Sequence, residues 1–226
     1  MKFDMSIKNQ DLTIYSSKNL GDFSNEFIIY YNENIERIKN VLLVKGNIKQ
    51  IVAITDDESN ANFVYGKSSF SGFFNNTGSF AYINLNGDKT KDYMFKGLMH
   101  ELTHHLYKYH VYGAAKERIT WVDEGLAQLL SGQKEELQNN TSYQLFLEEN
   151  LKDIEDIDLN ELNHNDRSFG NKNGYNLSYI AIRYLYETTQ QEEFADIIRN
   201  EATLKQLGEK ILRHAKKHYS SNGKQH

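Results

Sequence analysis

A change in hydrophobic periodicity near residue 91 is the feature that most constrains how this chain can fold. Before it, short runs of β-forming residues are separated by Gly, Asn and Asp, and one segment carries apolar residues at helical spacing. After it, apolar residues recur at helical spacing to near the C-terminus. Because strands followed by helices are typical of segregated architectures, we expect an α+β fold with a sheet lobe and a helical lobe.

The individual elements follow from the same periodicities, with turns at Gly, Asn and Asp because the chain has no proline. Residues 22–43 are predicted to form a helix capped by Asp22 or Ser24. The predicted strands are at 1–9 and 48–55 and, as a hairpin, within 62–88. The other predicted helices are at 91–111, 118–131, 134–150, 175–188, 191–199 and 202–218.

The length of 226 residues suits a single domain of two lobes. We expect residues 1–111 to form the sheet lobe, which ends in the helix at 91–111, and residues 112–226 to form the helical lobe. Hydrophobic residues make up 39% of the chain, so a core can form without disulfides or a structural metal. Since there is no Cys, only His, Asp and Glu remain as metal ligands.

Composition also bears on partners and location. The net charge of −5 gives no electrostatic reason to expect nucleic acid binding. No stretch reaches the roughly 18 apolar residues of a membrane span, so we expect no membrane association. The N-terminus reaches Asp4 before any apolar run and does not have the pattern of a signal peptide. These features predict a cytoplasmic protein, unless a leader has been removed; they do not indicate an oligomeric state.

The segment HELTHHLYKYH, residues 100–110, contains four histidines, of which His100, His104 and His110 stand at metal-ligand spacings. On a helix, His100 and His104 lie one turn apart on the same face and can bind one ion. Glu101 can then reach a water on that metal, which is why H-E-x-x-H combines two zinc ligands with a general base. A third protein ligand would leave one position open for water, as in catalytic zinc sites.

His110 is one candidate for the third ligand, because H-E-x-x-H with a His six residues later is the metzincin spacing. Metzincins have Gly where this chain has Tyr107, and that Gly lets the helix stop and turn. If the helix continues through Tyr107, His110 points about 100° away from the other two histidines. The Met-turn of metzincins is also missing, since all four methionines precede the motif. We therefore predict that His110 is solvated or ends a helix.

Glu124 is the other candidate. In WVDEGLAQLL, residues 121–130, the apolar residues fall on one helical face, while Glu124 and Gln128 fall on the other. The small residues Gly125 and Ala127 would let this helix approach another closely. Taken alone, this pattern favours a surface glutamate on an amphipathic helix.

The combination is more specific than its parts. HELTH at 100–104, with 19 residues between His104 and Glu124, and then WVDEGLAQ resembles the gluzincin metallopeptidases, in particular small bacterial families with H-E-L-T-H and W-x-x-E-G-x-A. YNLSYIAIRYL at 175–185 is similar to the family's downstream helix. The resemblance implies a zincin-like fold: a small twisted mixed sheet plus helix in the N-terminal lobe, a helical C-terminal lobe, and the active-site helix between them.

The resemblance also implies roles for individual residues. His100, His104 and Glu124 would be ligands to Zn²⁺, and Glu101 the general base. Tyr175 matches the position of a phenol that donates to the developing oxyanion, although Tyr179 lies one turn away and a core role is about equally compatible with Tyr175.

Two departures qualify this comparison. Thermolysin-like enzymes orient the first His with an Asp four residues after the third ligand; here Gln128 holds that position, and an amide adds no charge. The G-x-M-E-N element of aminopeptidases is missing, which favours an endopeptidase.

The predicted reaction is therefore hydrolysis of peptide bonds in a peptide or protein substrate. In the family fold an exposed edge strand before the metal helix binds extended peptide. SFAYINLN at 79–86 stands in that place and predicts substrate contacts at Phe80, Tyr82 and Asn84, although an ordinary half-buried strand would show the same alternation.

Three alternatives remain open: a catalytically silent or regulatory zincin-fold binding module, a helical interaction domain in which the motif is accidental, and a zinc hydrolase for another bond.

Overall fold

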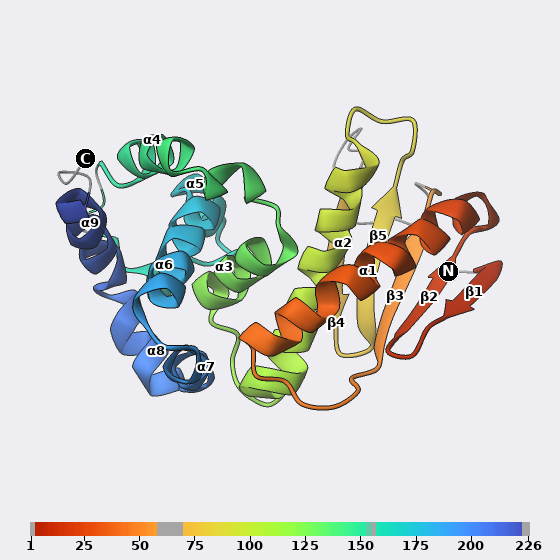
Figure 1. Cartoon of the computed structure of the whole chain (residues 1–226), viewed down its shortest axis with the longest axis horizontal. Helices are drawn as coiled ribbons and strands as arrows, with labels where there is room; N and C mark the ends of the chain where they lie inside the picture. Colours follow the sequence, from red (N-terminus) through yellow and green to blue (C-terminus); the bar gives the residue numbers. More distant parts are fainter. Residues whose placement is uncertain (1–2, 58–69, 153, 155–156, 223–226) are drawn as a thin grey trace. The chain divides into compact units, whose positions relative to one another are not determined.

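The computed structural model describes residues 3–57, 70–152, 154 and 157–222 (Figure 1). Contacts within the chain divide it into two compact units, Met1–Ala114 and Ala115–His226. Within the described residues, all strands lie in the first unit and the second unit is helical. The predicted α+β fold is confirmed.

The first unit is built on a five-stranded mixed sheet in the order β1-β2-β3-β5-β4. β2, β3 and β5 run parallel to one another, while β1 and β4 pair antiparallel with their neighbours. The strands are β1 Met5–Lys8, β2 Leu12–Ser16, β3 Gln50–Thr55, β4 Phe70–Asn75 and β5 Gly78–Ile83. The sequence predicted β1 and β3 but missed β2, although LTIYS alternates between buried and half-buried residues as a strand should.

Two helices pack with this sheet. α1 (Gly21–Val41) connects the parallel strands β2 and β3, as a crossover between parallel strands must. α2 (Lys91–Leu106) follows β5 and is the predicted metal helix. Phe95 of α2 packs against Phe23 and Phe27 of α1, with ring centroids 5.0 Å and 5.6 Å apart. The apolar stripe predicted for α2 is buried as expected; it consists of Phe95, Leu98, Leu102 and Leu106.

The predicted hairpin is present as β4 and β5, and its residues 62–69 lie outside the described part of the chain. Gly78 begins β5 with φ +152°, and a Cβ there would lie 2.5 Å from the carbonyl oxygen of Ile51, so the turn requires glycine. The prediction of an exposed edge strand at 79–86 is wrong. β5 pairs with β3 on one side and β4 on the other, and among the described strands β4 is the edge beside it.

The second unit is formed by helices, of which α3 and α6 pack most extensively. A Cβ on Gly125 of α3 would lie 2.4 Å from the backbone oxygen of Ser178 in α6, so glycine permits the close approach that the sequence predicted. Trp121 of α3 is fully buried. The helices are α3 Thr120–Ser131, α4 Asn140–Asn150, α5 Ser168–Asn171, α6 Gly174–Thr188, α7 Gln191–Arg199, α8 Glu201–Gly208 and α9 Ile211–Asn222, with short 3-10 turns at Glu135–Gln138 and Leu159–Glu161.

Several predicted boundaries are wrong for local reasons. Neither Asp22 nor Ser24 caps α1; both lie inside it, and the Ser24 hydroxyl donates to the carbonyl of Leu20 at 2.7 Å. The helix predicted at 134–150 is interrupted at Asn139, which is extended and whose side chain accepts from the backbone of Thr141. The helix predicted at 202–218 is two helices, α8 and α9.

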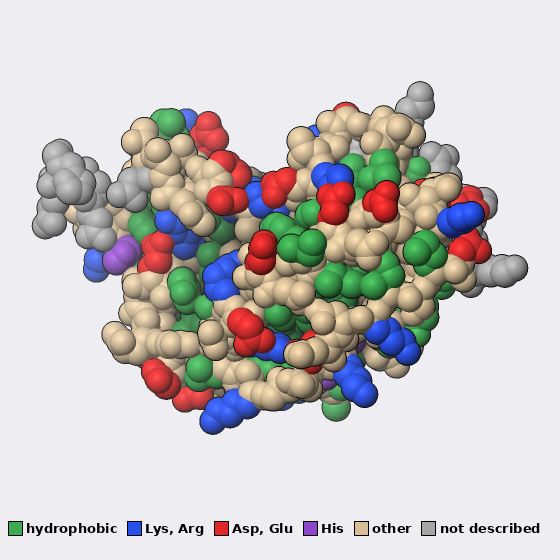
Figure 2. Space-filling model, turned by 45° about the vertical axis from the view of Figure 1, so that its right-hand side comes forward, with side chains coloured by type: hydrophobic (Ala, Val, Ile, Leu, Met, Phe, Trp, Pro, Cys, Tyr) green, Lys and Arg blue, Asp and Glu red, His purple; other side chains and the backbone are tan. Residues whose placement is uncertain are grey.

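No described helix combines the length and the apolar character that a bilayer span requires. On the face seen in Figure 2, the Lys and Arg side chains of the described residues are interspersed with Asp and Glu and form no continuous basic surface.

Candidate metal centre

His100 and His104 are placed by α2 alone. The hydroxyl of Thr90 caps this helix by accepting from the backbone of Tyr93, and the two histidines follow one turn apart. Their Nε2 atoms lie 2.9 Å apart, and their rings are perpendicular. Two nitrogens bound tetrahedrally to one zinc ion at 2.0–2.1 Å lie about 3.3 Å apart. The observed separation is about 0.4 Å shorter than this value and equals a hydrogen-bond distance, so a small movement of the two buried rings would admit a zinc ion.

The edge strand β4 lies against the same helix. A Cβ on Gly72 would lie 2.7 Å from Cγ of Glu101 and 2.9 Å from its Oε1. Two residues further, the ring of Phe74 stacks on His104 with centroids 4.9 Å apart. Alternate residues of one strand thus contact Glu101 and His104, so β4 and α2 together enclose the predicted base and one predicted ligand. The sequence did not predict this contact, which a helix motif cannot reveal.

The helix does not stop at Tyr107. Tyr107 has helical angles, φ −62° and ψ −53°, and the chain continues as a π-helix, η3 (Tyr107–Gly113). His110 is exposed, as predicted, and its ring lies 5.7 Å from that of His105. Burial, and next the charge of His110, lower the pKa of His105 to about 4, so His105 is neutral at pH 7. The metzincin geometry, in which the helix ends before the third histidine, is therefore missing.

Glu124, in the first half of α3, is buried and lies in a group of charged side chains within the second unit. Its Oε1 accepts from Nη2 of Arg118 at 2.8 Å and lies 3.0 Å from Nε2 of His164. The Nε of Arg118 donates to Asp123. Burial alone would lower the pKa of Arg118, but the charges of Asp123 and Glu124 outweigh it and raise that pKa, so the guanidinium stays charged. Sequence reasoning missed Arg118, Asp123 and His164.

Gln128, which was predicted to orient the first histidine, lies one turn after Glu124 in α3. The amide of Gln128 donates to the backbone carbonyls of Tyr175, at 2.8 Å, and Glu124, at 3.3 Å. It thus fixes the start of α6 relative to α3, and its predicted action on His100 stays a prediction.

The two candidate tyrosines differ sharply. The side chain of Tyr175 is 45% exposed, whereas that of Tyr179 is buried, and the hydroxyl of Tyr179 accepts from Arg183. Burial raises the pKa of Tyr179. Of the two, Tyr175 is the more accessible to solvent.

The residues predicted to bind substrate lie on or after β5. Cross-strand pairing sets Phe80 opposite Phe73, and these rings stack 4.9 Å apart. Because Gly72 and Phe74 face α2, Phe80 and Tyr82 lie on the other face of the sheet. Asn84 forms a turn, its side chain accepting from the backbone of Asn86. A substrate role for Phe80, Tyr82 and Asn84 stays a prediction that this arrangement does not favour.

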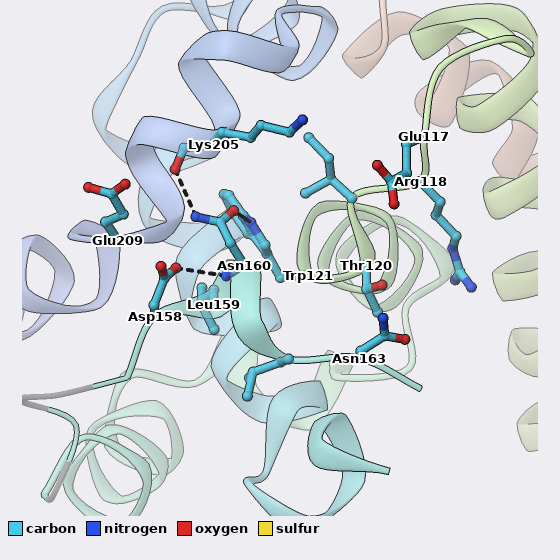
Figure 3. Close-up of a pocket in the computed structure, with 12 residues that line it drawn as sticks. Glu117, Arg118, Thr120, Trp121, Asp158, Leu159, Asn160, Asn163, Lys205 and Glu209 are labelled. Carbon is cyan, nitrogen blue, oxygen red and sulfur yellow. Dashed lines mark hydrogen bonds between the residues drawn. The ribbon is translucent and has the colours of Figure 1, made fainter. Parts of the chain in front are cut away.

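The second unit also contains a pocket of about 350 Å³ (Figure 3). Its walls are the segment before and at the start of α3, the 3-10 turn at Leu159–Glu161 with its flanking residues, and α8. Arg118 is part of the wall, but neither Glu124 nor Tyr175 is. The pocket lining mixes acidic, basic and amide side chains: Glu117, Arg118, Asp158, Asn160, Asn163, Lys205 and Glu209.

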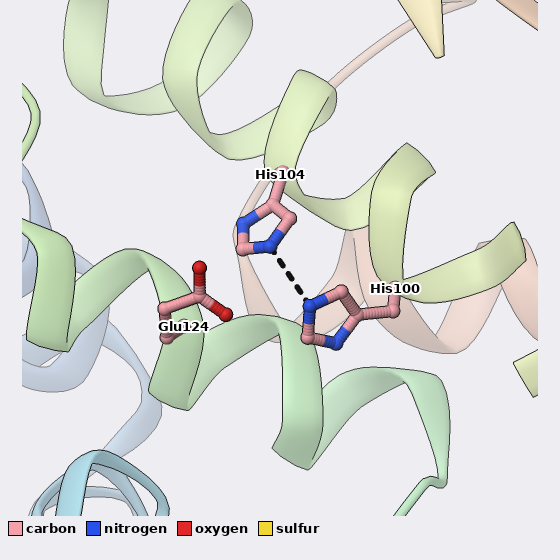
Figure 4. Close-up of side chains that lie close together, drawn as sticks. All are labelled: His100, His104 and Glu124. Carbon is pink, nitrogen blue, oxygen red and sulfur yellow. Dashed lines mark hydrogen bonds between the residues drawn. The ribbon is translucent and has the colours of Figure 1, made fainter. Parts of the chain in front are cut away.

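Figure 4 draws His100, His104 and Glu124, which offer two imidazole nitrogens and one carboxylate oxygen. This is a donor set that zinc accepts, with a position left for water. No curated protein matches the chain. The family model for collagenase, Peptidase_M9, matches residues 22–211, well over half of the sequence. The chain therefore belongs to the collagenase family of zinc metallopeptidases.

Proposed function

We propose that the chain is a zinc-dependent endopeptidase of the gluzincin type, with His100, His104 and Glu124 as the zinc ligands. The observation that carries this proposal is the 2.9 Å separation of the His100 and His104 Nε2 atoms beside Glu101, on a helix that continues past Tyr107. That continuation argues against His110 as the third ligand and in favour of a residue outside the helix.

Each residue then has a defined task. The bound zinc ion would lower the pKa of a water molecule and polarise the carbonyl of the scissile bond. Glu101 takes a proton from that water and passes it to the leaving amine. The phenol of Tyr175 donates a hydrogen bond to the carbonyl oxygen as it gains negative charge. Tyr179 is less suited, since its hydroxyl is buried and accepts from Arg183.

We further propose that the substrate adds to β4 as an extended strand. Strand addition at an open sheet edge holds a peptide by its backbone and does not require a free terminus. The contacts of Gly72 with Glu101 and of Phe74 with His104 would bring the peptide to the predicted base. This favours an endopeptidase. Since the family carries the name collagenase, denatured collagen is the first protein substrate to test.

The proposal is tested with the purified chain, gelatin and a library of internally quenched peptides. Wild type should contain one zinc ion, cleave within peptides, lose activity with 1,10-phenanthroline and regain it with Zn²⁺. Glu101→Gln should keep its zinc while kcat/KM falls by about 10² to 10⁴. The control Glu149→Gln, at an exposed position of α4, should match wild type.

Other results would direct the assignment elsewhere. Peptide binding without cleavage by the zinc-loaded wild type would identify a binding module. Full activity in Glu101→Gln would remove the proposed base.

A further inference from the structure

We infer that Arg118 and His164 are positioning residues that hold the carboxylate of Glu124 in the orientation that binds zinc; this rests on the proposed function. Nη2 of Arg118 and Nε2 of His164 both contact Oε1 of Glu124, at 2.8 Å and 3.0 Å. Two contacts to one oxygen restrict rotation of the carboxylate. A carboxylate held in this way can present its other oxygen to a cation in a fixed direction.

Arg118 is itself held in place. It lies just before α3, and its guanidinium bonds to both Asp123 and Glu124, which are adjacent in sequence. Asp123 is 1% exposed, and a buried carboxylate needs such a partner. The planar fork of arginine can serve two carboxylates at once, whereas lysine carries a single point of charge. Asp123 thus anchors the guanidinium that positions Glu124.

The charges of this group favour a dication. One guanidinium against the two carboxylates of Asp123 and Glu124 leaves one net negative charge, as +1 and −2 sum to −1. Without Arg118, two adjacent buried carboxylates would repel each other, and Glu124 would lose the donor that orients it. Arg118 therefore stabilises the buried carboxylate of Glu124, while the group of three side chains keeps a net negative charge.

His164 comes from a segment 40 residues further along the chain. Its ring packs on Phe169, with centroids 4.5 Å apart, and lies 5.8 Å from the ring of Tyr175. One side chain thus contacts both the proposed third ligand and the proposed oxyanion donor. To donate to Glu124, His164 must carry a proton on Nε2. The packing on Phe169 keeps Nε2 aimed at the carboxylate.

The test is the zinc affinity of His164→Gln and Arg118→Gln, measured by competition with a chromophoric chelator. The control is His214→Gln, at an exposed position of α9. We expect zinc dissociation constants 10- to 100-fold higher in both test variants and unchanged in the control. Arg118→Lys, which keeps the charge but loses the fork, should recover only part of the loss.

The melting temperature of the zinc-free form separates positioning from folding. His164→Gln should melt within about 2 °C of zinc-free wild type, because this ring is partly exposed. Zinc affinities within twofold of wild type in folded variants would overturn the inference and leave the proposed function intact. If Arg118→Gln does not fold, the zinc affinity of His164→Gln alone tests the inference. A wild type that binds no zinc would overturn both.

Discussion

The two sources of proposed ligands are positioned in different ways. His100 and His104 are one helical turn apart, so their 2.9 Å approach follows from local geometry once α2 has formed. Glu124 depends on side chains far along the chain: His164 lies 40 residues away, and the packing of α3 on α6 depends on Gly125 and Ser178. Two ligands on one helix can be predicted from their spacing. The position of a proposed ligand that is held by distant residues can be disturbed by substitutions at many places in the chain.

The largest expected effect is the loss of zinc on removal of Glu124, which tests whether the third ligand lies outside the metal helix. Glu124→Ala should lose its zinc after dialysis against a metal-limited buffer, and with it all measurable peptidase activity. His110→Ala should keep one zinc ion per chain, since His110 is exposed. Elemental analysis measures both. If only His110→Ala lost zinc, the third ligand would also be local, and the gluzincin assignment would be wrong.

The second effect concerns the oxyanion donor. Tyr175→Phe should lower kcat by about 10² to 10³ with little change in KM, because a hydrogen bond made only in the transition state is removed. Tyr179→Phe serves as the control. It removes a buried hydroxyl, so it should lower the melting temperature and leave kcat nearly unchanged. Peptide cleavage kinetics of the two variants, with melting temperatures, distinguish them. The reverse pattern would assign the role to Tyr179.

The third effect tests the packing that holds Glu124. Gly125→Ala should lower the free energy of unfolding by about 1–3 kcal/mol, although Ala is the better helix former, because its Cβ would overlap the backbone of Ser178. Urea denaturation gives this value. Gly170→Ala, where a Cβ meets no atom within 4 Å, is the matched control. Equal stability of the two variants would show that α3 and α6 can separate freely.

The smallest expected effect tests whether the position of Glu101 depends only on its own helix, α2, or also on the neighbouring strand β4. Gly72→Ala would push a methyl group against Glu101 and should lower kcat about tenfold, less than the hundredfold that a displacement of about 1 Å can cost. Zinc content should not change. Ser71→Ala, on the opposite face of the same strand, should match wild type. An active Gly72→Ala would mean that the Glu101 side chain moves aside at little cost.

What the sequence could predict follows the same division. The change from a strand-rich first part to a helical second part and the buried stripe of α2 follow from periodicity. The continuation of the helix through Tyr107 fits the lack of a Gly at that position. The close approach at Gly125 was also predictable, because a small residue on a helix face has few other uses.

The failures involve residues that meet only after folding. β2 was missed because five residues of alternation carry a weak signal beside a turn. The order of β4 and β5 in the sheet cannot be derived from a hairpin pattern, since either strand can be the outer one. Arg118 and His164 have no fixed spacing from Glu124 that defines a motif, so their contacts with it required a structure.

Among the described strands, β4 is an outer strand of the sheet, and this has a further consequence for solubility. Proteins commonly protect an outer strand from pairing with another copy by placing charges or proline on it. The sequence of β4, FSGFFN, contains neither, and Phe73 is exposed. If β4 binds a peptide by strand addition as proposed, the same backbone groups could pair with β4 of a second molecule. The proposed peptide binding therefore carries a corollary: concentrated solutions should self-associate through β4, and a peptide bound to this strand should reduce that association.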